Sequence, residues 1–290
     1  MSREAAFIDQ LRGLATHPAA RGLSDDCAVL ELCSETLILT HDMLLEGTHY
    51  MGGADMADVA WKLVATNLSD LAAKGAEPLG VLLGHQLGDN DDAFLNGLAE
   101  VLAHYNVPLL GGDTVSGTGP AAHGLTAIGR ATHTPVPSRS GAQIGDGLWI
   151  TGPVGAAMLG FEALRDASGA DHSAYSRPVA LLPQGQTLAP LVTAMMDVSD
   201  GLLLDALRLA EASQLSIAID GMAVPVVDPA RRLDCLTWGD DYQLLFTLPA
   251  RCKLAISATR IGTVEPRGFA PLLLDGEPLL NAEGLGYQHR

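Results

Sequence analysis

Acidic residues recur at the ends of the predicted secondary-structure elements of this chain. In "MMDVSDGLLLDALRLAEAS", Asp197 and Asp200 lie on either side of Ser199, where a short apolar run gives way to a helical pattern. Asp at a helix start is usually the N-cap, and Asp200 is a good cap for a helix that begins near Ser199. Because only one residue can be the N-cap, capping does not explain Asp197. Because ligands of α/β folds bind at the carboxyl ends of strands, Asp197 is a candidate ligand-binding residue.

Similar acids occur along the whole chain. They are Asp25, Asp26, Asp42, Asp70, Asp113, Asp197, Asp200 and the pair Asp240 and Asp241. A single Asp beside a glycine is most often a turn residue. Two carboxylates about 4 Å apart, however, repel by about 4 kcal/mol at an effective dielectric constant near 20, so converging acids must be protonated or bind divalent cations. Such cations would also neutralise a polyphosphate. The pattern therefore predicts phosphoryl transfer without a P-loop.

The elements that position these acids follow from the spacing of apolar residues. A long amphipathic helix is predicted over 55–74, with Asn67 on its apolar stripe and Asp70 at the edge of that stripe, so both should face the packed side. The other predicted helices cover 5–14, 91–105, 156–165 and a segment from about 199, and the predicted strands include 25–32, 35–43, 79–87, 107–112, 123–131, 147–151 and 242–246.

A linker rich in Pro, Ser and Thr, "ATHTPVPSRSGAQIGD", divides the chain. We predict an α/β (α+β) fold of two lobes, over 1–137 and 138–290. A nucleotide-loop interpretation of Gly152, Gly155 and Gly160 fails, because the spacing is wrong and no Lys-Ser/Thr follows.

Composition excludes several classes of protein. The chain of 290 residues is 48% apolar and only 18% charged, which is typical of a folded globular protein. A formal net charge of −17 argues against a nucleic-acid partner, because such binding needs a basic surface. No apolar run reaches the roughly 18 residues of a membrane span, and the first twenty residues lack a signal-peptide core. We therefore expect a cytoplasmic protein without a membrane partner. The four cysteines form no C-x-x-C pair and are expected to be reduced.

Seven ordered segments resemble the thiamine-monophosphate kinase family, which belongs to the aminoimidazole ribonucleotide synthetase-like (PurM-like) superfamily. They are "GLSDDCAVL", "THDMLLEGTHY", "NLSDLAAKGAEP", "GGDT", "SRSGAQIGD", "DVSDGL" and "GDDYQLLF", and they span nearly the whole chain. The resemblance implies ATP-dependent phosphorylation of thiamine monophosphate to thiamine diphosphate, with several Mg²⁺ ions. It also implies a homodimer with a PurM-like fold, in which an N-terminal sheet lobe pairs with its dimer mate and a C-terminal α/β lobe closes the site.

The resemblance also implies roles for single residues. The implied metal ligands are Asp26, Thr40, Asp42, Asp70, Asp113, Asp197 and Asp200, of which Asp26, Asp42 and Asp200 are the catalytic ones. Nucleotide contacts are implied for Gly112, Asp113, Arg139 and Ser199, and contacts to thiamine monophosphate for His49 and Asp240. Because the attacking phosphate oxygen is already ionised at neutral pH, positioning and charge neutralisation should carry the rate.

Some positions depart from the family pattern. His41 replaces a small hydroxyl residue and either crowds a metal site or adds a nitrogen ligand, Ser24 replaces a glycine, and Asp240 replaces a glutamate. The family's C-terminal aromatic residue is unmatched, since Gly284 falls near its place and Tyr287 is not equivalent.

Four alternative functions compete with this interpretation. A hydrogenase-maturation carbamoyl dehydratase would need a C-terminal cysteine, whereas this chain ends in "GYQHR". A selenophosphate synthetase would need a reactive Cys or Sec near the start, whereas the first cysteine is Cys27. A phosphotransferase with another acceptor, or a non-catalytic nucleotide-binding paralogue, stays open.

Overall fold

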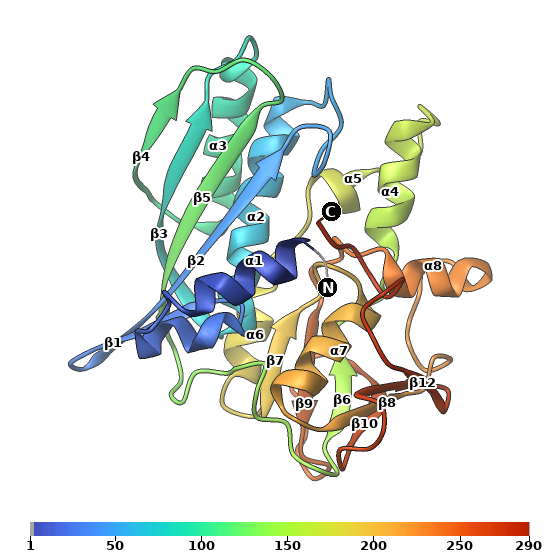
Figure 1. Cartoon of the computed structure of the whole chain (residues 1–290). Helices are drawn as coiled ribbons and strands as arrows, with labels where there is room; N and C mark the ends of the chain where they lie inside the picture. Colours follow the sequence, from blue (N-terminus) through green and yellow to red (C-terminus); the bar gives the residue numbers. More distant parts are fainter. Residues whose placement is uncertain (1–2, 290) are drawn as a thin grey trace.

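The computed structural model describes residues 3–289 and contains two β-sheets (Figure 1). The first is five-stranded, with the order β1-β2-β5-β3-β4. Its strands are β1 (Ala28–Leu32), β2 (Glu35–Leu45), β3 (Ala76–Gln86), β4 (Leu109–Val115) and β5 (Ala122–Ala131). Neighbouring strands are antiparallel except for β3 and β4, which are parallel and are connected through α3 (Asp91–Tyr105).

One face of this sheet is covered by α2 (Met56–Ala73) and α3, as Figure 1 shows. Side chains alternate along β2, so Thr40 and Leu44 are buried while Met43 is exposed on the opposite face. The helix α2 is buried along most of its length because it also contacts β7 and α6 of the second lobe. A helix in this position needs apolar residues on nearly all sides, as its sequence provides.

The second sheet is seven-stranded, with the order β12-β11-β8-β10-β6-β9-β7. Its strands are β6 (Gly147–Ile150), β7 (Ala194–Asp197), β8 (Ser216–Ile219), β9 (Leu244–Leu248), β10 (Thr259–Glu265), β11 (Leu272–Leu274) and β12 (Glu277–Leu279). The edge strand β7 pairs with β9 on one side only and contacts α2, so its carboxyl end faces the first lobe.

The remaining helices are short. They are α1 (Arg3–Arg12), α4 (Ala156–Arg165), α5 (Ser173–Ser176), α6 (Leu182–Leu188), α7 (Leu202–Ala212), α8 (Arg232–Thr237) and the 3-10 helices η1 (Pro18–Leu23) and η2 (Pro229–Arg231). At the start of α4 the cap comes from a distant residue, because Asp241 accepts hydrogen bonds from the backbone N–H groups of Gly155 and Ala157. Across residues 3–289, none of the helices has the length and apolar character needed to cross a membrane.

The structure corrects two local predictions. The helix α7 has Gly201 as its N-cap, and Asp200 is paired with Arg208 instead of capping the helix. The first strand begins at Ala28 rather than at Asp25, so Asp25 and Asp26 lie in the bend that precedes it. In that bend their side chains turn into the interior instead of alternating across a sheet.

Candidate active site

A cavity of about 960 Å³ lies between the two lobes and brings together most of the predicted site residues. Its lining includes Asp26, Asp42, His49, Asp70, Arg139, Asp197, Ser199, Asp200 and Asp240. Asp42 comes from β2, Asp70 from α2 and Asp197 from β7, and the others come from the segments that connect the elements, including the loop between β7 and α7. Thr40 joins the group indirectly, because its hydroxyl donates to the carboxylate of Asp70.

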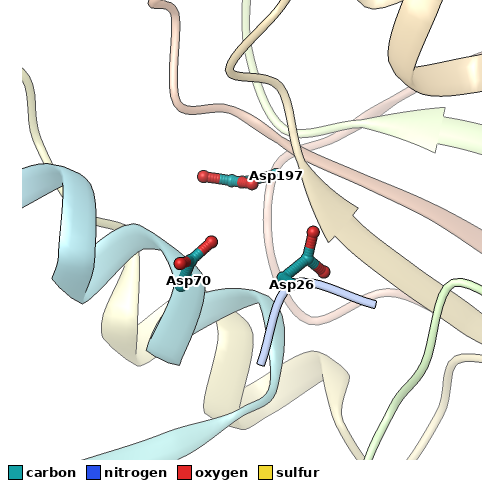
Figure 2. Close-up of side chains that lie close together, drawn as sticks. All are labelled: Asp26, Asp70 and Asp197. Atoms are coloured by element: carbon teal, nitrogen blue, oxygen red, sulfur yellow. The ribbon is translucent and has the colours of Figure 1, made fainter. Parts of the chain in front are cut away.

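Three carboxylates converge at the bottom of this cavity (Figure 2). One oxygen each of Asp26, Asp70 and Asp197 lie within 4.8 Å of one another. Asp26 comes from the bend before β1, Asp70 from the buried α2, and Asp197 from the last position of β7. Asn67, one turn before Asp70, is fully buried and accepts the backbone N–H of Asp42, so it fixes β2 against α2. The predicted inward orientation of Asn67 and Asp70 is confirmed.

Among the side chains that the structure describes (residues 6–289), no lysine or arginine pairs with Asp42, Asp70 or Asp197. Burial, followed by the charges of Asp26 and Asp200, raises the pKa of Asp42 to about 6. Burial, followed by the charge of Asp26, raises the pKa of Asp197 to about 7, although the Ser69 hydroxyl donates to it at 2.6 Å. The pKa of Asp70 is raised well above its usual value by burial and then by Asp42. No lysine or arginine of the described side chains therefore neutralises these three carboxylates.

Asp25 and Asp26, in contrast, are surrounded by basic groups. The fully buried Lys74 donates to Asp25 Oδ1 at 2.6 Å and also to Asp26 Oδ2, while Arg139 binds Asp26 Oδ1 through Nε at 2.7 Å. Arg21 pairs with the second oxygen of Asp25. Burial alone would raise the pKa of Asp25, but Lys74 and then Arg21 outweigh burial and hold this pKa well below its usual range.

The loop between β7 and α7 is held by a residue that the sequence analysis missed. Asp205 is fully buried in α7, and its Oδ2 accepts the backbone N–H groups of Ser199 and Asp200, each at 3.1 Å. Its Oδ1 accepts Arg208 at 2.9 Å, and the same guanidinium pairs with Asp200. The signal for Asp205 is its place on the apolar stripe of the helix, three residues after Leu202 and four before Leu209.

The other end of the cavity contains the predicted acceptor contacts. Asp240 has a left-handed backbone with φ 58° and accepts Lys62 Nζ at 2.8 Å and the Tyr242 hydroxyl at 2.9 Å. His49 Nδ1 accepts the backbone N–H of Leu45 at 2.9 Å, which leaves the proton of the neutral ring on Nε2. Burial, followed by the neighbouring His289, lowers the pKa of His49, so the neutral form is favoured.

His41 also lines the cavity, and its ring contacts the sheet. Its Nδ1 is 2.9 Å from the Thr126 hydroxyl of β5, and its ring lies over Gly124. Gly112 and Asp113, although both are described, are not among the residues that line the cavity. The register aligns Asp113 with Gly84, Gly124 and Met43 across β4, β3, β5 and β2. Three strand spacings separate Asp113 from Met43 by about 14 Å.

The chemistry of this donor set fits Mg²⁺. All the charged donors are carboxylate oxygens, and Thr40 adds a hydroxyl, which are the ligands that hard cations prefer. The shortage of positive charge at Asp42, Asp70 and Asp197 is what a divalent cation would compensate. The site can therefore hold cations beside a bound polyphosphate.

Comparison with known proteins agrees with this geometry. The family models "AIR synthase related protein, N-terminal domain" and "AIR synthase related protein, C-terminal domain" match residues 24–131 and 143–269. The thiamine-monophosphate kinase of Escherichia coli K12 is 35% identical, covering 98% of this chain and 96% of that protein.

Solved structures give the same result. A structure described as AaThiL complexed with AMPPCP and TMP has a TM-score of 0.88 at 27% identity, covering 99% of this chain and 97% of the other. The thiamine-monophosphate kinase of Stenotrophomonas maltophilia has a TM-score of 0.77 at 30% identity, covering 94% and 96%. The mixed α/β fold with two sheets confirms the predicted fold class. On these grounds, the chain belongs to the thiamine-monophosphate kinase family of the AIR synthase related proteins.

Proposed function

We propose that this chain is a thiamine-monophosphate kinase, which transfers the γ-phosphoryl group of ATP to thiamine monophosphate and forms thiamine diphosphate. The observation that carries the proposal is the inter-lobe cavity, which has an acidic cluster at one end and His49 with Asp240 at the other. Its volume of about 960 Å³ is large enough for two small molecules end to end. Family membership and a relative described with AMPPCP and TMP support the same conclusion.

The reaction needs little covalent chemistry from the protein. A phosphate oxygen of thiamine monophosphate attacks the γ-phosphorus of ATP, the bond from this phosphorus to the β,γ-bridging oxygen breaks, and ADP leaves. The attacking oxygen is ionised at neutral pH, so no general base is required. Catalysis then consists of alignment of the two phosphates and neutralisation of their charge.

Each predicted site residue has a place in this scheme. Asp26, Asp42, Asp70, Asp197 and Asp200, with Thr40, would hold Mg²⁺ ions, which neutralise negative charge on the phosphate oxygens when they are bound. Arg139 lines the cavity with 19% of its side chain accessible, and it can donate to a phosphate oxygen. Ser199 would contact the nucleotide beside it. His49 and Asp240 would contact thiamine monophosphate at the far end of the cavity.

We further propose that the chain acts as a homodimer through the uncovered face and edge of the first sheet. Large apolar side chains are exposed on this surface, which consists of Met43, Leu45, Leu82, Leu109, Leu110 and Val115. Such a surface is unusual for a monomer. Because Asp113 lies about 14 Å from Met43 within its own chain, Gly112 and Asp113 would serve the nucleotide site of the partner. The lobe boundary at 137/138 and a cytoplasmic location, where ATP is available, belong to this proposal.

The proposal is tested by incubating the purified protein with ATP, Mg²⁺ and thiamine monophosphate and identifying the products by mass spectrometry. We expect thiamine diphosphate and ADP in equal amounts, and no product without Mg²⁺ or with the Asp200→Asn variant. ADP without thiamine diphosphate, or product with another phosphate acceptor, would indicate a related phosphotransferase. Bound ATP that stays intact would indicate a non-catalytic paralogue.

A further inference from the structure

Lys74 is a fully buried cation directly beside the acidic cluster. It follows the last residue of α2, and its Nζ lies 2.6 Å from Asp25 Oδ1, in contact with Asp26 Oδ2, and 3.3 Å from the carbonyl oxygen of Met195. An ammonium group has three N–H donors, and here there are three acceptors. All three N–H donors of Lys74 thus have acceptors within the protein, and the side chain has no exposed surface with which to contact a substrate.

Both oxygens of Asp26 are consequently occupied by protein cations. Oδ2 accepts Lys74, and Oδ1 accepts Arg139 Nε at 2.7 Å. Asp26 nevertheless belongs to the group of carboxylates, with Asp70 and Asp197, whose oxygens lie within 4.8 Å of one another (Figure 2). Among the described side chains, the carboxylates of Asp70 and Asp197 accept only hydroxyl groups, from Thr40 and Ser69. The cluster is therefore asymmetric, with positive charge supplied on one side only.

A purely structural role does not account for this arrangement. A buried ion pair is weak evidence for stability, because a well-packed apolar replacement is often as stable. Lys74 also joins two consecutive carboxylates, one of which contacts Arg21 and the other Arg139, so five charged groups alternate in sign along one buried row. Asp26, the fourth group of that row, belongs to the carboxylates on which a divalent cation would be bound.

We propose that Lys74 is a resident cation of the metal site, which competes with divalent ions for Asp26 and confines tight metal binding to the side of Asp70 and Asp197. This inference rests on the proposed function, because it assumes that the cluster binds divalent ions. Removal of the ammonium group frees one oxygen of Asp26 and removes a positive charge a few ångströms from the ion. At that distance and with little solvent between them, like charges repel strongly.

The test is binding of Mn²⁺ alone to the full-length Lys74→Met variant, measured by electron paramagnetic resonance of free Mn²⁺ and by calorimetry. Methionine has a similar length and flexibility but no charge. We expect Mn²⁺ to bind at least tenfold more tightly than to the wild-type protein, or with one additional ion per chain. An affinity and a stoichiometry equal to those of the wild type would overturn the inference, as would an absence of Mn²⁺ binding to both proteins.

Lys62→Met is the matched control. Lys62 is also buried on α2 and paired with an aspartate, Asp240, so the change in net charge is the same. Twelve residues of helix place it about 18 Å from Lys74 along the axis. We expect its Mn²⁺ affinity to stay within about threefold of the wild type, because charges at this distance interact weakly. An equal gain in both variants would mean that net charge alone tightens binding, which would overturn the inference.

A second comparison covers the case in which Lys74→Met does not fold. Asp25→Asn removes the ionic partner of Arg21, and the Lys74→Met change added in that background leaves Asp26 paired with Arg139. We expect the double variant to bind Mn²⁺ at least tenfold more tightly than Asp25→Asn alone, and equal affinities would overturn the inference. Because Mn²⁺ binding is read without turnover, a failed product assay would reject the proposed reaction without changing this result.

Discussion

Asp205 shows how a residue outside the cavity can set the geometry of the site. Its carboxylate holds the backbone of Ser199 and Asp200 and also the guanidinium of Arg208. An Asn at this position keeps one acceptor oxygen but directs an NH₂ group at donors. We expect Asp205→Asn to lower the free energy of unfolding by about 1–3 kcal/mol and to lower kcat by more than tenfold. Urea unfolding and steady-state kinetics measure both effects, with the exposed Glu211→Gln of the same helix as control. Kinetics equal to those of this control would contradict the prediction.

His123, which is not one of the active-site residues, makes the stability of the protein depend on pH. Its ring stacks on His85 with centroids 4.7 Å apart, and neither of its nitrogens has a hydrogen-bond partner among the described residues. Burial, followed by the charge of His85, lowers the pKa of His123 to about 4. Below about pH 6.5, His123 therefore binds a proton in the unfolded chain but not in the folded chain. The free energy of unfolding consequently decreases as the pH falls from about 6.5 toward 4.

The His123→Phe variant tests this effect. It removes the ionisable group and keeps a planar ring beside Phe94. We compare the decrease in the free energy of unfolding from pH 7 to pH 5 in the two proteins. We expect this decrease to be smaller in the variant than in the wild type, by up to about 2 kcal/mol. Urea titrations at the two pH values measure the difference. A parallel decline in both proteins would show that other groups cause the acid sensitivity.

At the scale of elements, local patterns predicted α2, α3 and α4 closely. Apolar residues at helical spacing define these helices, and the start of α2 is fixed by Asp55, which caps it through the N–H of Ala57. Local sequence patterns could not predict which residues the site residues contact. Lys74 contacts Asp26 across 48 residues of chain and Arg139 contacts it across 113, so neither pair has a local signal. The resemblance identified which acids gather, whereas only the fold showed that Asp113 lies apart.

The packing of α2 against α3 depends on Gly97. A Cβ atom at this position would lie 2.3 Å from the carbonyl oxygen of Ala57, so the two helices cannot cross as closely with any larger residue. We expect Gly97→Ala to lower the free energy of unfolding by about 1–3 kcal/mol, even though alanine favours helix. Gly88→Ala is the control, since its added Cβ would have an ordinary contact 3.9 Å from Asp91. Equal stabilities of these two variants in urea would contradict this account of the crossing.

For the whole molecule, the uncovered face of the first sheet is the surface that determines assembly. Leu82 lies on β3 with a residue exposure of 39%, beside other apolar residues of that surface. A charge placed there would be buried without a partner in a dimer but solvated in a monomer. We expect Leu82→Glu to halve the mass measured by light scattering while the circular dichroism spectrum stays unchanged. A wild-type protein that is itself monomeric would reject the proposed dimer.

If the dimer completes the nucleotide site, two inactive variants should restore each other. In a protomer with Asp113→Asn, Asp42 is intact, and in one with Asp42→Asn, Asp113 is intact. When the two are coexpressed, half of the dimers are mixed and each has one site with both residues, so about a quarter of the wild-type activity should return. Because each protomer lacks one of the two residues, restored activity can come only from a site that combines Asp42 of one protomer with Asp113 of the other. Mixed dimers that form, as seen by native mass spectrometry, but stay inactive would place the function of Asp113 within its own protomer.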